Sequence, residues 1–269
     1  MQATRFAVAL AVCASALLIA QQKRDGYKDT PILPGQKWHV HDPDRPYPKA
    51  VTPAATPGGA PSDAIVLFDG KDLSKWTQKD RRGNPVDPQW TVRDGYVEVK
   101  HGTSDLITRD SFGSCQLHIE YQEPEGIVGE SQERGNSGVY LMSTYEIQVL
   151  DSYRAPTYAD GQAGAIYGQW PPLVNPARPP GEWNVFDVAF EAPQFDGGKV
   201  VKPAYITLFF NGVLVHNHMA LNGPTEWRVI LPYKPHGELP LKLQDHASSR
   251  PVRYRNIWIR PLLPYDQPE

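Results

Sequence analysis

The sequence predicts an all-β protein, a two-sheet sandwich of the jelly-roll type. From about residue 64 onward, short segments that alternate apolar and polar residues recur with turn signals between them, and no long amphipathic helical pattern interrupts them. The composition agrees, because 27 Pro, 22 Gly, 13 Tyr and 7 Trp in 269 residues are typical of a loop-rich β protein. Ten or more strands joined by Pro-rich connections favour two packed sheets.

The N-terminal part of the chain is expected to lie outside this fold. Residues 1–20 combine a basic start with an uncharged apolar run, which is typical of a secretory signal peptide and is shorter than the roughly 20 apolar residues of a membrane span. Cys13 suggests a lipoprotein anchor, but Val12 is a poor match to that processing site, and an uncleaved N-terminal anchor is a further alternative. Residues 21–62 are rich in Pro, Ala, Gly and Thr, which predicts a disordered linker. One folded domain would then span residues 63–264.

Charge and cysteine content narrow the class of protein. The net charge is −3 and no long basic run occurs, so nucleic acid is not expected as a partner. Cys115 is the only cysteine beyond the predicted signal peptide, so a mature chain cannot form an internal disulfide. The predicted signal peptide indicates a secreted or bacterial periplasmic protein, and export without disulfides is compatible with a bacterial periplasm. Cys115 alternates with Leu117, Ile119 and Tyr121, so we expect a buried, unreactive thiol.

The expected strands are segments that alternate in polarity or are rich in β-branched and aromatic residues. In chain order they are residues 64–70, 90–100, 106–110, 114–122, 137–142, 145–151, 183–192, 204–210, 213–219, 241–246 and 252–262.

One hairpin can be placed closely, because Asn211-Gly212 between two of these strands is the strongest short hairpin signal. A two-residue turn pairs Phe210 with Val213, and strict alternation then assigns every neighbour to a face. The expected core face carries Ile206, Leu208, Phe210, Val213 and Val215. The opposite face would carry Tyr205, Thr207, Phe209, Leu214, His216 and His218, an aromatic and polar surface suited to a sugar.

The strand at residues 145–151 carries the first candidate site. Its letters resemble the Glu-x-Asp-x-x-Glu strand of laminarinase-type β-glucanases, with Glu146, Gln148 and Asp151 at the three positions. Glu146 and Gln148 are two apart and share one face, whereas Asp151 needs a bulge to reach it. Ordinary glycoside hydrolysis uses two carboxylates, and an amide cannot exchange a proton. Glu146 is therefore the predicted acid/base; the alternative is a polar, solvent-facing strand surface.

Three further groups are candidates. Gln244 and His246 share one face of the strand at residues 241–246, and Asp245 beside His246 suggests an acid/base pair or a metal site; alone, this signal is weak. His216 and His218 have the i, i+2 spacing of metal ligands on a strand, but they need Glu146 or Asp245 to complete a site, and surface histidines are the alternative. In the loop over residues 125–141, which contains Glu130, Glu133, Arg134 and Asn136, Arg134 is the candidate for binding sugar hydroxyls; a solvated loop is the alternative.

An ordered set of motifs resembles the 3-keto-disaccharide hydrolase domain family over roughly residues 64–262. These motifs are "LFDGKDLSKW", "GNSGVYL", "YEIQVLD", "GAIYG", "PPGEWN", "FFNGVLVHN" and "LQDHASSRPVRYRNIWIRPL". The resemblance implies a concanavalin A-like jelly roll of the lectin/glucanase type. It also implies action on sugars already oxidised at C3, usually by a partner sugar 3-dehydrogenase.

The chemistry of a 3-keto sugar accounts for the amide at Gln148. A ketone at C3 acidifies the C2 proton, so a base can remove it, the enolate expels the aglycone oxygen from C1, and water adds to the enone. This route needs a base, an enolate stabiliser and a proton donor, but no nucleophilic carboxylate. We expect Glu146 as acid/base, His246 as the second titrating group and Asp245 as its orienter.

The remaining candidates would bind substrate or a cation. Gln148, Arg134 and Gln244 would hold the sugar, Tyr205 and His218 would line the substrate face, and His216 with His218 would contact the keto oxygen or a divalent metal. Three other classes stay open: a non-catalytic glycan-binding module, a conventional β-glucanase-like hydrolase, and a structural envelope protein.

Overall fold

The computed structural model describes residues 24–247 and 250–266, so the predicted signal peptide at residues 1–20 lies outside the described residues. The chain divides into two compact units. Within the described part, the smaller unit holds residues 24–49 and 264–266, with an isolated bridge between Ile32 and His39 and an ion pair of 2.6 Å between Arg45 and Asp266. The larger unit, residues 50–263, contains every named strand. No helix among the described residues is long and apolar enough to cross a membrane.

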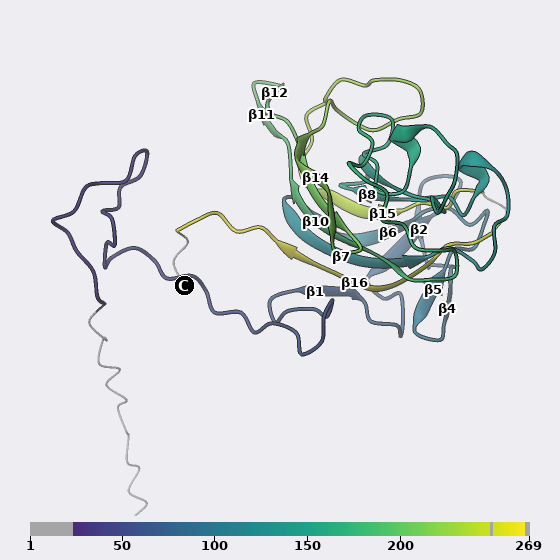
Figure 1. Ribbon diagram of the computed structural model, residues 1–269, viewed down its shortest axis with the longest axis horizontal. Coiled ribbons are helices and arrows are strands. Elements are labelled where there is room, and N and C mark those ends of the chain that lie inside the picture. Colours follow the sequence, from purple (N-terminus) through teal and green to yellow (C-terminus); the bar gives the residue numbers. More distant parts are fainter. Residues whose placement is uncertain (1–23, 248–249, 267–269) are drawn as a thin grey trace, which may run out of the picture. The chain divides into compact units, whose positions relative to one another are not determined.

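The larger unit is an all-β sandwich of two antiparallel sheets, as predicted, and Figure 1 shows β7, β10 and β16 in one layer and β6, β8 and β15 in the other. The strands of the larger sheet, in spatial order, are β14 (Val213–Ala220), β13 (Tyr205–Phe210), β10 (Asn184–Glu191), β7 (Cys115–Gln122), β16 (Arg253–Pro261), β5 (Tyr96–Glu98) and β4 (Thr91–Arg93), with β1 (Ile65–Phe68) also paired to β16. The strands of the second sheet are β3 (Pro85–Val86), β2 (Trp76–Lys79), β6 (Leu106–Phe112), β15 (Leu239–Leu243), β8 (Ser137–Leu141) and β9 (Tyr145–Val149). A hairpin of β11 (Gln194–Asp196) and β12 (Lys199–Lys202) stands apart, and the short 3-10 turns are η1 (Ser131–Glu133) and η2 (Ala159–Gly161).

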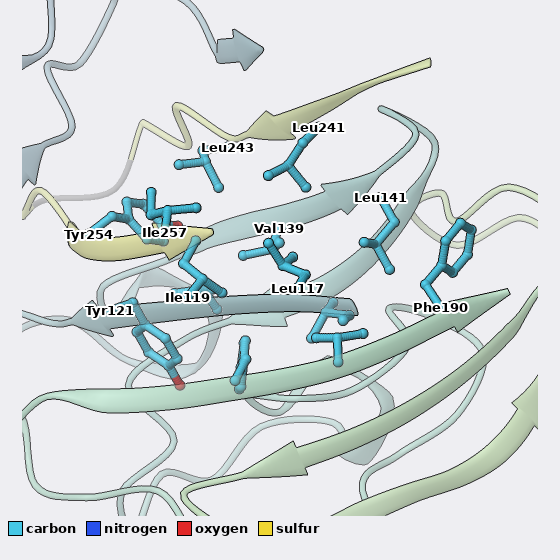
Figure 2. Packing of buried hydrophobic residues seen from close by; sticks show 14 of the residues in the cluster. Leu117, Ile119, Tyr121, Val139, Leu141, Phe190, Leu241, Leu243, Tyr254 and Ile257 are labelled. Carbon is cyan, nitrogen blue, oxygen red and sulfur yellow. The ribbon is translucent and has the colours of Figure 1, made fainter. Parts of the chain in front are cut away.

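The hydrophobic core lies between the two sheets, because each strand turns its alternate apolar side chains inward. In Figure 2, Val139 and Leu141 of β8 and Leu241 and Leu243 of β15 lie opposite Ile119 of β7. Cys115 belongs to this core, and burial raises the pKa of its thiol to about 12, so the prediction of an unreactive thiol is confirmed. The alternate positions of β8, β9 and β15 consequently face away from the core.

Every segment predicted to be a strand overlaps one, although β15 covers only the first three residues of the segment at 241–246, and several elements were missed. The segment at residues 90–100 is two strands, β4 and β5, because Asp94 and Gly95 both adopt positive φ and turn the chain back. The strands β2 and β3 and the hairpin β11–β12 were not predicted. They are two to four residues long, too short for alternation to be read from the sequence.

The predicted register of the β13–β14 hairpin is correct only near its turn. Phe210 pairs with Val213 as expected, but register shifts follow, so Leu208 pairs with His216 and Ile206 with Met219. Each extra residue on β14 reverses the alternation beyond it. His216 is therefore 1% exposed rather than on a sugar-binding face. Val213 lies before the shifts, in the predicted register, but it is 41% exposed rather than in the core.

The disordered linker predicted for residues 21–62 does not extend to residues 50–62, which are ordered within the larger unit. The amide of Thr52 donates to the Ser62 hydroxyl, and the amide of Ser62 donates back to the Thr52 carbonyl. The carbonyl of Gly58 accepts bonds of 2.9 Å from the side chains of Asn256 and Trp258 on β16. Polar groups of the sheet thus compensate for the lack of large apolar residues in this segment.

Candidate active site

The second sheet carries a cavity of ≈ 680 Å³ on the face that points away from the core. Its floor comes from alternate residues of β8, β9 and β15, and its walls come from the loops before β8, after β9 and after β14. The lining residues are Gln132, Glu133, Asn136, Tyr140, Ser143, Thr144, Glu146, Gln148, Tyr158, Tyr167, Pro224, Thr225, Glu226, Trp227, Leu231, Lys242, Gln244 and His246. A concave site of this size, lined by several polar side chains, is typical of a small-molecule binding site.

Glu146 and Gln148 of β9 both lie in the cavity floor, on the shared face that their spacing predicted. They are only 4% and 1% exposed, so a polar, solvent-facing strand surface is not what forms here. Burial raises the pKa of Glu146 to about 8, because the surrounding protein disfavours the ionised form more than water does. A carboxyl with this pKa is mostly protonated at neutral pH.

Tyr140 and Lys242 are floor residues that sequence reasoning missed. Tyr140 is the cross-strand partner of Glu146, and its hydroxyl hydrogen-bonds to the Glu146 carboxyl. The ammonium of Lys242 lies 3.7 Å from the centre of the Tyr140 ring and 3.3 Å from Asp105. Both the hydrogen bond from Tyr140 and the charge of Lys242 lower the pKa of Glu146 and partly offset its burial.

Gln148 is held by a network of side-chain amides. Its Nε2 donates to the side-chain oxygens of Asn136, at 3.1 Å, and Gln132, at 3.2 Å. Gln132 in turn donates to the Thr157 hydroxyl and to the Gly161 carbonyl. The amide is therefore fixed in orientation, as required of a group that positions a ligand rather than exchanging a proton.

The residues that follow β15 contribute Gln244 and His246, again on the face that parity predicted. Nε2 of Gln244 donates to the Tyr140 hydroxyl at 3.1 Å. Its Oε1 and the Nδ1 of His246 are buried and find no hydrogen-bond partner among the described residues. Unsatisfied buried polar atoms are rare in folded proteins, and a role in binding or catalysis is one reason for them. Burial also lowers the pKa of His246, so its imidazole is neutral at pH 7.

Asp245 does not orient His246, as was expected from their adjacency. Its carboxylate accepts hydrogen bonds from the ring of His101, at 3.0 Å, and from the backbone amides of Thr103 and Ser104. Neighbouring residues on an extended chain point to opposite sides, so Asp245 ties the loop before β6 while His246 faces the cavity.

Arg134 is also placed elsewhere than predicted. Its guanidinium donates to Asp151 at 2.6 and 3.0 Å and to the Tyr153 carbonyl at 3.1 Å, and both charged side chains are buried. A buried carboxylate and guanidinium are stable when paired, so this ion pair is a structural link beneath the loop. Of the four loop residues named from the sequence, Glu133 and Asn136 line the cavity, and Gln132 of the same loop lines it too.

The candidates on the larger sheet do not reach the cavity. Tyr205 and His218 stack with ring centres 4.1 Å apart, and Nε2 of His218 contacts Glu191 at 3.0 Å. His216 donates from Nε2 to the Gly164 carbonyl at 2.8 Å. The two histidines thus have separate partners and do not form the metal site predicted for them. No group of three or more His, Cys, Asp and Glu suited to a metal ion occurs in the described residues.

Gly138 of β8 leaves room for the Glu146 carboxyl, and this gives a first prediction. A Cβ at Gly138 would overlap a Glu146 carboxyl oxygen and lie 2.7 Å from the Tyr140 ring. Gly138→Ala is expected to displace Glu146, to lower the free energy of unfolding by about 1–3 kcal/mol, and to lower turnover of a substrate. Chemical unfolding and kinetics measure both effects. Gly237→Ala is the control, since no atom lies within 4 Å of its Cβ; equal behaviour of the two variants would contradict the packing argument.

Comparison with known proteins identifies similar chains. The family model for the 3-keto-alpha-glucoside-1,2-lyase-like domain matches residues 63–260. A 3-keto-disaccharide hydrolase of Bacteroides thetaiotaomicron is 29% identical over 156 residues, which cover 45% of this chain and 50% of that protein. The aligned region thus spans about half the length of this curated relative.

Solved structures resemble the fold. A Parabacteroides distasonis protein provisionally assigned as a glycosyl hydrolase is 44% identical, with a TM-score of 0.76, and the match covers 86% of this chain and 100% of that one. A second protein of that organism with the same assignment is 22% identical, with a TM-score of 0.54, and covers 75% of this chain and 94% of that one. The second likeness shows the fold alone.

Proposed function

The chain belongs to the family of 3-keto-alpha-glucoside-1,2-lyase-like domains, and from this premise we propose that it cleaves glycosides whose sugar carries a ketone at C3. The name of the Bacteroides relative and the hydrolase assignment of the 44%-identical Parabacteroides protein support a glycosidic substrate. A sugar 3-dehydrogenase would supply the ketone. The expected export of the protein remains a prediction, because residues 1–20 lie outside the described residues.

One observation carries the proposal: a carboxyl with a raised pKa and an imidazole with a lowered pKa line the same cavity. Glu146, with a pKa of about 8, is mostly protonated at pH 7, whereas His246 is neutral. These are the protonation states that a general acid and a general base require. A glycan-binding module would have no need of them.

In the proposed reaction, His246 takes the C2 proton and the electron pair moves into an enolate at C3. The C1–O bond then breaks, and Glu146 gives its proton to the departing aglycone oxygen. Water adds to C1 of the resulting enone and a proton returns to C2, so the net result is hydrolysis. The ammonium of Lys242 is the cavity group suited to stabilising the enolate oxygen, whereas both N–H groups of Gln148 already donate to Gln132 and Asn136.

A conventional glycosidase mechanism is the second candidate, because Glu133 and Glu226 also line the cavity. Either would supply the second carboxylate that β9 lacks, so that the C1–O bond is cleaved with the C2–H bond intact. The two routes therefore differ in the fate of one hydrogen atom.

Turnover in deuterium oxide separates these routes. We expect the protein to cleave a 3-keto-glucoside, to leave the unoxidised glucoside intact, and to place deuterium at C2 of the product, as measured by mass spectrometry. A reaction without protein, sampled at the same short times, corrects for spontaneous exchange. Cleavage without C2 deuterium would favour the conventional route, and parallel reactions with a chelator would reveal a required divalent cation.

A further inference from the structure

A second cavity, of ≈ 790 Å³, adjoins the first. Tyr158, Tyr167 and Trp227 line both cavities, so the two form one continuous groove with an aromatic boundary between them. The other lining residues are Asp160, Gly168, Arg228, Val229 and Ile230. A glycoside bound with its sugar over Glu146 would extend its aglycone across this aromatic boundary.

The second cavity is apolar where the first is polar. Trp227 and Ile230 are 61% and 76% exposed, and Val229 beside them is exposed as well. Large apolar side chains that lie close together in the sequence and face water at the rim of a groove mark a binding surface. The hydroxyls of Tyr158 and Tyr167 bond to each other at 3.0 Å, so they already have a partner. The charged side chains in this lining are Asp160 and Arg228, and the Arg228 guanidinium lies over the Trp227 ring, 5.1 Å from its centre.

The loop that carries Trp227, Val229 and Ile230 is held in place by hydrogen bonds at its start. The hydroxyl of Thr225 accepts a bond of 2.9 Å from the amide of Glu146 and donates to the Thr144 carbonyl at 3.1 Å. The side chain of Gln169 donates to the carbonyl of Gly223 at 3.0 Å and accepts from the amide of Asn222 at 2.8 Å. The loop that carries Trp227 is thereby joined to β9, so the wall is formed before a ligand arrives, which reduces the entropic cost of binding.

We propose that this second cavity binds the aglycone, and that the preferred aglycone is an apolar group rather than a second sugar. The identity of the group as an aglycone rests on the proposed function, since that function places the sugar in the first cavity. The preference follows from the lining, which exposes more apolar than polar surface despite Asp160 and Arg228, so burying an apolar group against Val229 and Ile230 is favourable.

The test compares n-hexyl, methyl and glucosyl glucosides of the same anomer with the full-length protein. Calorimetry measures the affinity for the unoxidised compounds, and initial rates give kcat/KM for their 3-keto forms. Hexanol and methanol are leaving groups of similar acidity, so the comparison reports binding rather than chemistry. We expect the hexyl compound to exceed both others at least about tenfold in affinity and in kcat/KM, since its methylenes would be buried against the apolar lining.

Two variants test whether the second cavity causes the preference for the hexyl compound. Ile230 lines only the second cavity, so Ile230→Ser is expected to bring the hexyl-to-methyl ratio to within about twofold of 1. Val201 lies on the separate hairpin strand β12 and is 62% exposed, so Val201→Ser should keep the wild-type ratio.

Three outcomes would overturn the inference: equal affinities, a preference for the glucosyl compound, or a change in sedimentation of Ile230→Ser that marks the patch as a self-association surface. If no 3-keto compound is cleaved but the affinities differ as expected, the proposed function fails while the apolar binding site stands. If cleavage occurs without a preference, the function stands and the binding site fails.

Discussion

Glu146→Gln is expected to lower kcat on a 3-keto-glucoside by about 10²–10⁴-fold, which is the usual contribution of a positioned general acid or base. Glutamine fills nearly the same volume and still offers a hydrogen-bonding partner to Tyr140, but it has no proton to give to the leaving group. Stopped or steady-state assays of product release measure the loss. Glu130→Gln removes an exposed carboxylate outside the cavity lining and should retain wild-type turnover. Undiminished turnover in Glu146→Gln would exclude Glu146 from the mechanism.

The same substitution is expected to stabilise the fold. The pKa of Glu146 rises from 4.5 to about 8 on folding, so the folded protein favours the protonated carboxyl. Stability is therefore greatest below pH 4.5, where the carboxyl is protonated in both states, and this stability is lost as the pH rises through 8. At pH 7 the wild-type protein therefore bears a cost on the order of 1–3 kcal/mol, which glutamine, having no charge to bury, avoids. Denaturant unfolding at pH 5 and pH 8.5 tests this, since the advantage of the variant should grow between the two. A variant that is both inactive and less stable would instead indicate misfolding.

The pH dependence of activity assigns the role of Glu146 as acid or base. As an acid it must be protonated, so kcat/KM should fall as the pH rises through about 8. As a base it would have to be ionised, and kcat/KM would rise over that range. Glu226 also raises the pKa of Glu146 by charge repulsion, so in Glu226→Gln the fall of kcat/KM should occur at lower pH.

The sequence predicted the faces of strands well wherever alternation runs unbroken. Glu146, Gln148, Gln244 and His246 all lie on the faces that parity assigned, and all four line one cavity. The period-2 rule needs only local backbone geometry, so it holds without knowledge of the tertiary structure. Lys242 has the same parity as Gln244 and could have been included by the same argument. Tyr140, two residues after Gly138 in "GNSGVYL", offered a similar signal.

The alternation rule failed where a bulge interrupted a strand, and sequence reasoning also failed where the residues in contact are far apart in the sequence. The bulges in β13–β14 moved His216 into the interior, and no local signal marks a bulge without glycine. Arg134 was predicted to bind substrate. The sequence pattern did not reveal that its partner is Asp151, which lies 17 residues away on another segment. The walls that contain Trp227 and Tyr158 were not found, since the positions of long loops depend on contacts such as that between Thr225 and Glu146.

The imidazole of His246 is expected to contribute as much to catalysis as Glu146, although Asp245, its neighbour in the sequence, is not the partner that was predicted. His246→Asn should lower kcat by about 10²–10⁴-fold, because asparagine can hydrogen-bond to substrate but cannot accept a proton from C2. Burial lowers the pKa of His246, so in the wild type the free base persists below pH 6.5 and activity falls only when the ring is protonated in more acidic solution. This acidic limb should disappear in the variant.

Chemical rescue distinguishes a base from a structural residue at this position. His246→Ala removes the ring and enlarges a cavity that already admits small molecules, so added imidazole should restore part of the turnover with a pH dependence set by the free imidazole. A residue that only supports the fold would not respond to imidazole. His101→Asn is the matched control, because His101 contacts Asp245 without lining the cavity and its electrostatic interaction lowers the pKa of His246. That variant should keep its turnover while the acidic limb moves to higher pH, whereas a loss as large as that of His246→Asn would place the essential histidine at position 101.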